Sequence, residues 1–356
     1  MSTERKNAHA WVEVDLGNLL KNAQTVQAQN PNGRLLPMVK ADAYGLGALP
    51  VIRALESLAP WGYGVATIEE AVELRKAGVK RPIVVFTPAL QDRLDLFRAY
   101  DIHPVLEDPA VISDWKRPFH LEIDTGMGRS GIPWHDREAI AAAAASGPES
   151  IFMHFHSADE SPESVRRQLA RFDEILHALE LPKTVLVHVA NSAGSFVVGN
   201  RFDLIRPGVF LYGGAAGVNH PPPEQVAALF SRVVSLRRIR MGETVSYGAE
   251  WMAHSETTIA TLSIGYADGV RRRIQGKGYV MIGDRRFPVV GRVTMDMTLV
   301  DVGGAEVSLG DVATVFGGSG EAAITLDEFA GWAGTISYEI LTGLGHRLPR
   351  VYMPTP

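Results

Sequence analysis

Short apolar runs alternate with helical patterns from about residue 34 to residue 230, and this alternation restricts the possible folds more than any other feature. Candidate strands lie at 34–39, 62–66, 82–86, 102–106, 119–124, 150–155, 184–189 and 203–206. Helical patterns fill the intervals, for example 67–77, 91–99, 134–145 and 162–179. Eight strand-then-helix units of this length predict an α/β fold, a (β/α)8 barrel of TIM type. A doubly wound sheet is less favoured, because no glycine-rich dinucleotide turn follows the first strand.

The pattern changes beyond about residue 231. Apolar runs are there separated by Gly and Asp turns, which predicts an antiparallel β domain with one late helix at 326–344. The runs are Thr258–Leu262, Tyr279–Ile282, Val289–Val290, Leu299–Val302 and Val312–Phe316. We therefore expect two domains, 11–230 and 231–356. Residues 11–16 read as an additional strand before the barrel, which could return to pair with the second domain.

Charge and composition exclude several classes of function. The net charge of -5 gives no electrostatic reason to expect nucleic acid or an anionic membrane as partner. The chain has no run of about 18 apolar residues that could span a membrane. The segment Met1–Lys6 lacks an apolar signal core, which favours a cytoplasmic location. With no cysteine, the chain has no disulfide, thiolate metal site or cysteine nucleophile, and we expect no metal site.

Charged and polar side chains gather at the ends of the predicted strands, where barrels of this type carry their chemistry. Each such residue has an ordinary structural explanation, but five separate units contribute to one face of the barrel. The residues are Lys40, Arg129, His154, His188 with Asn191 and Ser192, and Arg206 with Gly208 and Val209. Their convergence predicts an active site.

The residue types in this set suit one cofactor. Lys40, partly desolvated at the mouth of its strand, could hold an aldehyde as an imine. Ser192 and the backbone N–H groups around Gly208 could bind a phosphate, since the last loops of such barrels commonly do so. Arg206 offers a permanent cation, and Arg129 a fork for a carboxylate. Together they indicate a pyridoxal phosphate enzyme that acts on an amino acid.

The sequence closely resembles the alanine racemase family, whose members are fold-type III pyridoxal phosphate enzymes. The matching stretches follow the family order and span nearly the whole chain: 37–47 (PMVKADAYGLG), 124–131 (DTGMGRSG), 154–160 (HFHSADE), 191–193 (NSA), 206–213 (RPGVFLYG), 263–269 (SIGYADG), 291–297 (GRVTMDM) and 337–352 (SYEILTGLGHRLPRVY). The resemblance implies a barrel followed by a β domain that the N-terminal strand joins. It also implies interconversion of L- and D-alanine, for peptidoglycan supply or for catabolism, by a head-to-tail homodimer with shared active sites.

The resemblance further implies a role for each matching residue. Lys40 and Tyr266 would be the two bases, one on each face of the substrate, with Tyr266 contributed by the partner subunit. Arg206 would face the pyridine nitrogen of the cofactor, with His188 orienting it and His154 beside the ring. The phosphate would be bound by Tyr44, Ser192, Gly208, Val209 and Tyr352. Arg129 and the partner's Met295 would hold the substrate carboxylate, and Asn191 and Asp296 would support the site.

The chain departs from the family pattern at three positions. Many members carry a carbamylated lysine two residues before the DTGM motif, where this chain has Glu122. A glutamate is already an anion and could orient Arg129 without carbon dioxide, so we expect activity to be independent of bicarbonate. Thr294 and His156 also depart from common residues, which leaves the preference for alanine over serine open.

Other functions are compatible with a barrel that binds pyridoxal phosphate. A fold-type III decarboxylase or D-amino-acid aldolase does not combine the GYADG motif, Arg206 and the Met295-Asp296 pair in this arrangement. A racemase of broader or different substrate range remains an alternative. A non-enzymatic pyridoxal phosphate carrier of the single-barrel kind would need neither Tyr266 nor a second domain.

Overall fold

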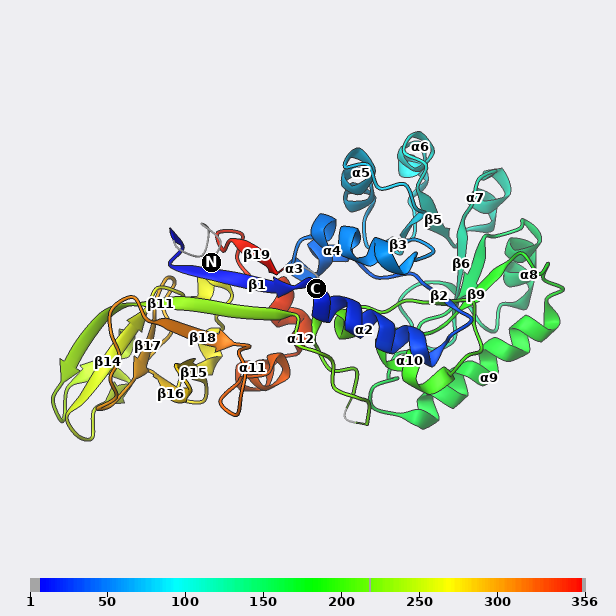
Figure 1. Cartoon of the computed structure of the whole chain (residues 1–356). Helices are drawn as coiled ribbons and strands as arrows, with labels where there is room; N and C mark the ends of the chain where they lie inside the picture. Colours follow the sequence, from blue (N-terminus) through cyan, green and yellow to red (C-terminus); the bar gives the residue numbers. More distant parts are fainter. Residues whose placement is uncertain (1–6, 218, 354–356) are drawn as a thin grey trace.

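Eight short strands close into a barrel. The computed structural model describes residues 7–217 and 219–353 (Figure 1). In the order of the barrel wall the strands are β2 (Arg34–Leu35), β3 (Tyr63–Val65), β4 (Ile83–Val85), β5 (His103–Leu106), β6 (His120–Asp124), β8 (Ser150–Phe152), β9 (Leu186–His188) and β10 (Leu204–Ile205). The register pairings between them are parallel, and β10 pairs back to β2. A short strand, β7 (Ile132–Pro133), adds to β6.

Backbone hydrogen bonds close the two remaining junctions of the barrel wall, between β2 and β3 and between β9 and β10. Between β2 and β3, Val39 N–H donates to the Gly64 carbonyl over 2.8 Å. Between β9 and β10, Asp203 N–H donates to the Val187 carbonyl over 2.9 Å. The predicted barrel is confirmed, and each of its eight strands lies within the range expected from the sequence.

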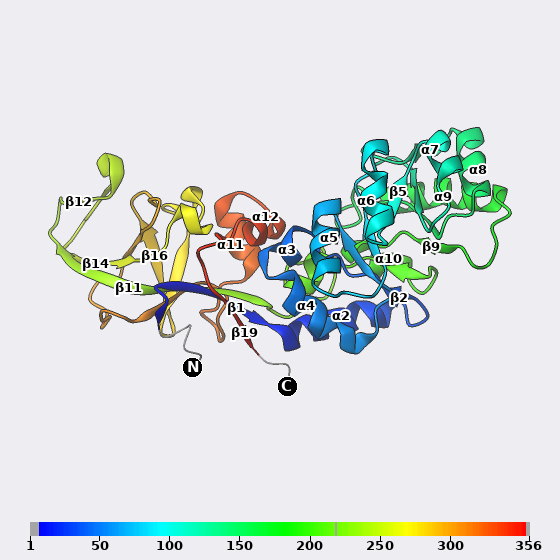
Figure 2. The ribbon, with the colours of Figure 1, turned by 90° about the horizontal axis from the view of Figure 1, so that it is seen from above.

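Helices cover the outside of the barrel (Figure 2). They are α2 (Leu16–Gln29), α4 (Ala48–Leu55), α5 (Ile68–Lys76), α6 (Leu94–Ala99), α7 (Pro109–Asp114), α8 (Arg137–Ala145), α9 (Pro162–Ala178) and α10 (Ser192–Val198). In α9, Val165, Phe172 and Ile175 form the buried face. Ser161 caps its first turn by accepting Ser164 N–H, and Pro162 suits the first helical position.

The interior of the barrel holds a small apolar cluster of its own. Its members lie in or next to six of the eight strands and pack on one another: Leu36, Trp61, Val84, Val105, Phe152 and Leu204. Three polar side chains are fully buried beside them, namely His120, Ser150 and His188. An interior that mixes apolar and polar layers is unusual for this fold, because branched aliphatic side chains normally fill it.

The second lobe is an eight-stranded sheet in the order β14-β17-β16-β15-β18-β11-β1-β19, with β14 also paired to β11. The strands are β1 (Ala10–Asp15), β11 (Ala227–Ile239), β14 (Thr257–Leu262), β15 (Tyr279–Ile282), β16 (Arg285–Val290), β17 (Thr298–Asp301), β18 (Val312–Phe316) and β19 (Arg350–Met353). A hairpin of β12 (Thr244–Val245) and β13 (Trp251–Met252) extends from the far end of the lobe (Figure 2). The predicted antiparallel β domain is confirmed.

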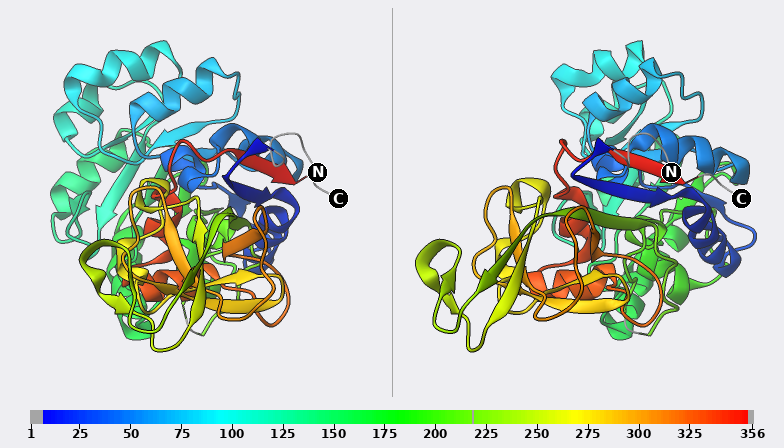
Figure 3. Two further views of the ribbon diagram at one scale, coloured as in Figure 1. Left: turned by 90° about the vertical axis from the view of Figure 1, so that its left-hand side faces the viewer. Right: turned by 60° about the vertical axis from the view of Figure 1, so that its left-hand side comes forward.

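Strand β1 joins this second lobe although it precedes the barrel in sequence. It runs antiparallel to β11 and parallel to β19, so the first and last described strands lie side by side (Figure 3). The predicted boundary between residues 230 and 231 falls inside β11. The segment Met1–Lys6, which led us to expect a cytoplasmic location, lies outside the described residues.

The late helix predicted at 326–344 is instead two helices, α11 (Leu326–Ala333) and α12 (Ser337–Thr342). Gly334 separates them in the left-handed region, with φ of 66°. A glycine ends helices in this way because it has no Cβ to oppose positive φ. Of the described helices, none is long and apolar enough to cross a membrane.

Candidate active site

The segment after the first barrel strand has an unusual backbone. It is labelled α3 (Lys40–Gly45), but four successive non-glycine residues in it are left-handed, with φ between 52° and 58°: Ala41, Asp42, Ala43 and Tyr44. Left-handed helical geometry costs roughly 1–2 kcal/mol per L-residue. Such strain persists only where the surroundings hold it, and it is often found at functional sites.

Two carboxylates brace this left-handed turn. Glu70, from the first turn of α5, accepts Ala41 N–H over 2.5 Å, and its second oxygen accepts Ala66 N–H over 2.8 Å. Asp42 accepts Ala48 N–H over 2.7 Å. The bond to Ala41 satisfies a donor of the turn itself, and the other two tie the turn to the starts of α5 and α4. The turn places Lys40 and Tyr44 at the mouth of the barrel.

A cavity of about 120 Å³ opens there, at the carboxyl ends of the strands. It brings together nine residues that the sequence analysis placed in the site: Lys40, Tyr44, Arg129, His154, Asn191, Ser192, Arg206, Gly208 and Val209. Met38, Phe86 and Tyr338 complete its lining. A larger cavity, of about 660 Å³, shares Lys40, Tyr44 and Tyr338 and extends between Glu70 and α12.

The three added lining residues were not assigned roles from the sequence. Phe86 follows β4 directly, so the strand-end rule that found Lys40 could have found it. Tyr338 comes from α12 in the second lobe, and its ring lies 6.0 Å from that of Tyr44. Its motif was recognised, but no sequence signal indicates that α12 packs against the left-handed turn.

The surroundings of Lys40 lower the pKa of its ammonium group. Burial lowers the pKa of its ammonium, the Arg129 cation lowers it further, and Arg206 adds in the same direction. The Glu70 carboxylate opposes these effects. Because the net shift of the pKa is downward, a larger fraction of Lys40 is unprotonated near neutral pH than for an exposed lysine.

Arg206 is almost wholly buried. Its Nη1 donates to His188 Nδ1 over 2.6 Å, and its Nη2 donates to the Met153 carbonyl over 2.8 Å. The guanidinium also lies over the rings of Phe152 and Phe86, 5.2 and 5.8 Å from their centroids. Burial lowers the pKa of Arg206 to about 10, so it remains a cation at neutral pH.

His154 lies beside this cation, with Nδ1 3.5 Å from Arg206 Nη2. Burial lowers the pKa of His154 to about 3, and the nearby cations Arg206, Arg129 and Lys40 contribute in the same direction. The imidazole is therefore neutral over the physiological range. It can pack on a planar ligand without adding charge to the cavity.

The part of the cavity lined by Tyr44, Ser192 and Gly208 suits an anion. Ser192 Oγ accepts Gly208 N–H over 2.9 Å, which leaves its own proton free to be donated elsewhere. A Cβ at Gly208 would lie 2.3 Å from the Tyr44 hydroxyl oxygen, so only glycine lets the backbone approach this ring. Asn191 caps α10 by accepting Gly194 N–H over 2.8 Å. Two hydroxyls and a closely packed backbone thus converge on one point.

Two predicted residues lie near the cavity but not among the described residues that line it. Glu122 is buried and accepts the Ser130 hydroxyl over 2.8 Å. Burial raises the pKa of Glu122, although Ser130 and Arg129 partly oppose the rise. Tyr352, from β19, donates its hydroxyl to the Leu46 carbonyl over 3.0 Å, at the end of the left-handed turn.

Tyr266, Met295 and Asp296 belong to the second lobe and do not line either cavity as far as the described residues show. Backbone bonds hold their two loops together: Tyr266 N–H donates to the Thr294 carbonyl and Ala267 N–H to that of Met295, each over 3.0 Å. Tyr266 and Met295 are 45% and 53% exposed. Both loops therefore present large side chains to the surface.

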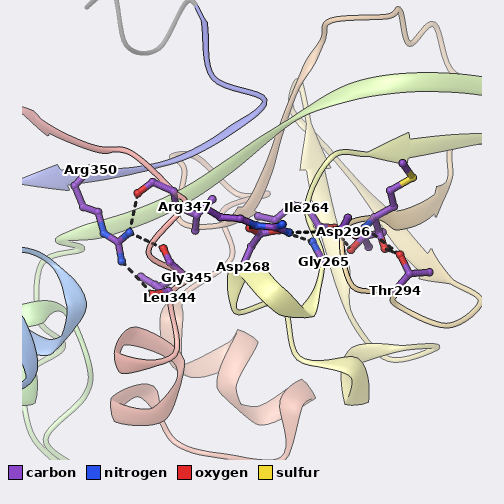
Figure 4. A network of polar contacts seen from close by, with 12 residues as sticks. Ile264, Gly265, Asp268, Thr294, Asp296, Leu344, Gly345, Arg347 and Arg350 are labelled. Carbon is purple, nitrogen blue, oxygen red and sulfur yellow. Dashed lines mark hydrogen bonds and ion pairs between the residues drawn. The ribbon is translucent and has the colours of Figure 1, made fainter.

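One arginine ties the two loops together (Figure 4). Arg347 donates to both carboxylate oxygens of Asp268, over 2.5 and 3.0 Å, and to Asp296 over 2.7 Å. Asp268 also accepts Gly265 N–H over 2.9 Å. The resulting Asp268–Arg347–Asp296 brace fixes the backbone on either side of Tyr266 and Met295.

Two family models match most of the chain. The family model described as "Alanine racemase, N-terminal domain" matches residues 14–216, and the one described as "Alanine racemase, C-terminal domain" matches residues 226–352. The chain belongs to the alanine racemase family.

Curated members of the family are similar over nearly their whole length. The alanine racemase of Carboxydothermus hydrogenoformans is 34% identical, over 96% of this chain and 99% of that protein. The alanine racemase of Geobacter sulfurreducens is 36% identical, over 96% of each.

Solved structures of alanine racemases are also similar. That from Bartonella henselae, with covalently bound pyridoxal phosphate, has a TM-score of 0.89 at 31% identity and covers 97% of this chain and 100% of its own. That from Bacillus anthracis, with bound L-Ala-P, has a TM-score of 0.88 at 29% identity and covers 97% and 95%.

Proposed function

We propose that this alanine racemase interconverts L- and D-alanine with Lys40 as one base and Tyr266 of a second copy as the other. The reaction and the use of pyridoxal phosphate are those of its family. The observation that carries the assignment of residues is the cavity itself. It holds a lysine of lowered pKa, a buried arginine cation and two converging hydroxyls.

The residues present fit pyridoxal phosphate. The Lys40 amine would hold the aldehyde, Arg206 would face the pyridine nitrogen, and the hydroxyls of Ser192 and Tyr44 would hold the phosphate with the backbone at Gly208 and Val209. The close approach of Gly208 to Tyr44, which a single Cβ would block, supports a built phosphate cradle. When bound, the cofactor supplies an electron sink that acidifies the α-hydrogen of the amino acid.

The protein then has to position the substrate and move one proton. Arg129 would bind the substrate carboxylate as a fork. Lys40, once free of the aldehyde, would take or return the α-proton on one face at Nζ. Arg206 keeps its own protons, so it does not deliver a full proton to the ring nitrogen. We infer that this limits the negative charge drawn into the ring and favours return of the proton to the α-carbon.

A second base is needed on the opposite face, and Tyr266 is the candidate. It is half-exposed on the second lobe, with Met295 beside it. We propose a homodimer in which the partner's Tyr266 reaches the α-carbon and the partner's Met295 helps to hold the carboxylate. The Asp268–Arg347–Asp296 brace would hold Tyr266 in position for proton transfer.

Subunit mixing tests this arrangement. Lys40→Ala and Tyr266→Phe proteins should each be nearly inactive, because each lacks one base in every site. After unfolding and refolding together, half of the dimers should be mixed, and each mixed dimer has one intact site. We expect about a quarter of wild-type activity to return. No recovery, with mixed dimers demonstrated by differently tagged chains, would mean that both bases come from the same chain.

Glu122 would act through the loop that carries Arg129. Its carboxylate holds Ser130, the residue next to Arg129, and Glu107 accepts Gly131 N–H over 2.5 Å. We propose that these two acids fix the loop and that activity does not depend on bicarbonate. Racemisation measured in carbon dioxide-free buffer, with and without added bicarbonate, tests this. A rise in kcat with bicarbonate would exclude it.

We also propose a cytoplasmic location and a role in D-alanine metabolism, either supply for peptidoglycan or breakdown. Chiral analysis of products from alanine, serine, lysine and arginine would define the substrate range. Growth of a deletion strain only when D-alanine is supplied would support the supply role, and unimpaired growth without it would favour breakdown.

A further inference from the structure

A file of hydrogen-bonded side chains runs from Arg206 through the interior of the barrel to its opposite end. His188 Nε2 lies 2.9 Å from Ser150 Oγ, and Ser150 Oγ lies 2.5 Å from His120 Nδ1. His120 Nε2 in turn lies 3.2 Å from His103 Nδ1. We call Arg206, His188, Ser150, His120 and His103 the polar file.

The polar file spans the length of the barrel. His103, His120 and Ser150 each begin their strands, β5, β6 and β8, whereas His188 ends β9. The register pairs His120 with Ser150 directly across neighbouring strands. The file therefore connects the cofactor end of the barrel with the amino-terminal ends of the strands, where His103 is only partly buried.

Arg206, at one end of the polar file, sets the direction of each hydrogen bond along it. An arginine can only donate, so His188 Nδ1 must accept from Arg206. A neutral His188 then carries its proton on Nε2 and donates it to Ser150. If His120 also donated to Ser150, the serine proton would lack an acceptor among the described residues in a fully buried site. Ser150 therefore donates to His120 Nδ1, and His120 Nε2–H donates to His103 Nδ1.

Burial supports the neutral state that this direction requires. His120, Ser150 and His188 have no exposed surface. Burial lowers the pKa of His188 and His120 well below the ordinary value, with Arg206 adding to the effect at His188 and His103 at His120. Burial also lowers the pKa of His103 to about 4; of its charged neighbours, Asp101 opposes this shift and Arg75 adds to it.

Aromatic contacts hold the rings in the planes that the bonds need. His188 is stacked on Phe152, with centroids 5.0 Å apart and planes inclined by 3°. Trp61 packs edge-on against both His120 and His103, at 5.8 and 6.1 Å. His188 and His120 each have a partner on both ring nitrogens, so reversing the direction of the file would require several protons to shift together.

We propose that Ser150, His120 and His103 are positioning residues, which hold His188 as the Nε2–H tautomer and thereby fix the Arg206 guanidinium for the ring nitrogen of the cofactor. This inference rests on the proposed role of Arg206. It extends the site to residues at the far end of the barrel that touch neither substrate nor cofactor.

The direct test is the tautomer of each ring, read from long-range ¹H–¹⁵N correlation spectra of protein labelled with ¹⁵N-histidine. Signals are assigned with single His→Gln variants. In the wild-type protein at neutral pH, with and without pyridoxal phosphate, we expect His188, His120 and His103 all to be neutral and protonated on Nε2. A cationic ring or an Nδ1–H ring at any of the three positions would overturn the proposal.

Ser150→Ala interrupts the file at its centre. We expect the His120 and His188 signals to shift or broaden as their fixed hydrogen bonds are lost. The dissociation constant for pyridoxal phosphate should rise about twofold to tenfold, the equivalent of one hydrogen bond. Ser231→Ala is the matched control, because Ser231 is equally buried but lies in β11, and its hydroxyl has no partner among the described residues.

The outcomes separate the two proposals. Equal cofactor affinity in the Ser150→Ala and Ser231→Ala proteins would refute a positioning role for the file. The tautomers are measured without turnover. If the three histidines have the predicted tautomers but the protein does not racemise alanine, only the proposed function is refuted.

Discussion

Replacing Gly208 by alanine is the sharpest single test of the phosphate cradle. The backbone of Gly208 has φ of -127° and ψ of -101°, so the substitution adds a Cβ without requiring a positive φ. That Cβ would lie 2.3 Å from the Tyr44 hydroxyl oxygen and 3.2 Å from its ring carbon Cζ. The closest contact of the added Cβ is therefore with the Tyr44 side chain.

Tyr44 has little room to move away. Its ring is stacked on Tyr212 with centroids 4.6 Å apart, and Tyr338 packs at 6.0 Å. Its backbone belongs to the left-handed turn that Glu70 and Asp42 brace. Overpacking of this kind costs about 1–3 kcal/mol, so thermal unfolding of the Gly208→Ala apo-protein should occur roughly 1–4 °C lower. Pyridoxal phosphate should also bind more weakly.

A second substitution separates the clash from other effects. In Gly208→Ala/Tyr44→Phe the nearest atom is the ring carbon at 3.2 Å, which needs a shift of only a few tenths of an ångström. The double variant should recover most of the lost Tm, but not the cofactor affinity, because the Tyr44 hydroxyl is gone. Gly331→Ala, where a Cβ meets nothing within 4 Å, should leave Tm unchanged or slightly higher.

The result that would refute this reasoning is a double variant no more stable than Gly208→Ala alone. The loss would then come from the loop itself and not from Tyr44. Differential scanning fluorimetry of the apo-proteins gives the stabilities. Titration with pyridoxal phosphate, followed by absorbance, gives the affinities.

Three further predictions concern other parts of the site. Glu70→Ala removes the acceptor of the Ala41, Ala66 and Thr67 N–H groups and should lower the free energy of unfolding, measured in urea, by about 1–3 kcal/mol. An unchanged unfolding midpoint would mean that the left-handed turn needs no brace. Burial raises the pKa of Glu122 above 4.5, so ionisation of its carboxyl group lowers the stability of the wild-type protein as pH rises through the raised pKa. Glu122→Gln should therefore have a higher Tm than wild type at pH 7. The difference in Tm should shrink toward pH 4.5. A constant difference between pH 4.5 and pH 7 would contradict that shift. Arg347→Lys cannot bind Asp268 and Asp296 in the same forked geometry, so kcat should fall roughly tenfold through misplacement of Tyr266, with cofactor affinity unchanged. Equal losses of kcat and of cofactor affinity would argue against a brace confined to the Tyr266 loop.

The barrel could be predicted because its strands are short apolar runs bounded by helical patterns, and strand ends then identify Lys40, Arg206 and their neighbours without any knowledge of side-chain contacts. The left-handed turn could not be predicted, since Ala41, Asp42 and Ala43 have no intrinsic preference for positive φ and are held there by Glu70 from the next unit. The break in the late helix had a visible signal in Gly334, but a glycine within a helical pattern does not by itself show where the helix ends.

The sequence predicts those site residues that lie at the carboxyl end of a barrel strand, because the position of each follows from its own strand alone. Tyr338 and the polar file depend instead on how separate segments pack. His103, His120 and Ser150 begin their strands, where the strand-end rule expects only stabilising residues. Their hydrogen-bonded connection to Arg206 can be seen only in the folded barrel, where β5, β6, β8 and β9 lie side by side.

The position of β1 has a consequence for biosynthesis. This strand is translated before the barrel, yet its neighbours β11 and β19 are translated only after it. An apolar strand with two unfilled edges must therefore wait while the barrel folds behind it, and it is open to pairing with other nascent chains meanwhile. Slow translation or a stalled ribosome should make aggregation through β1 a characteristic failure of this protein.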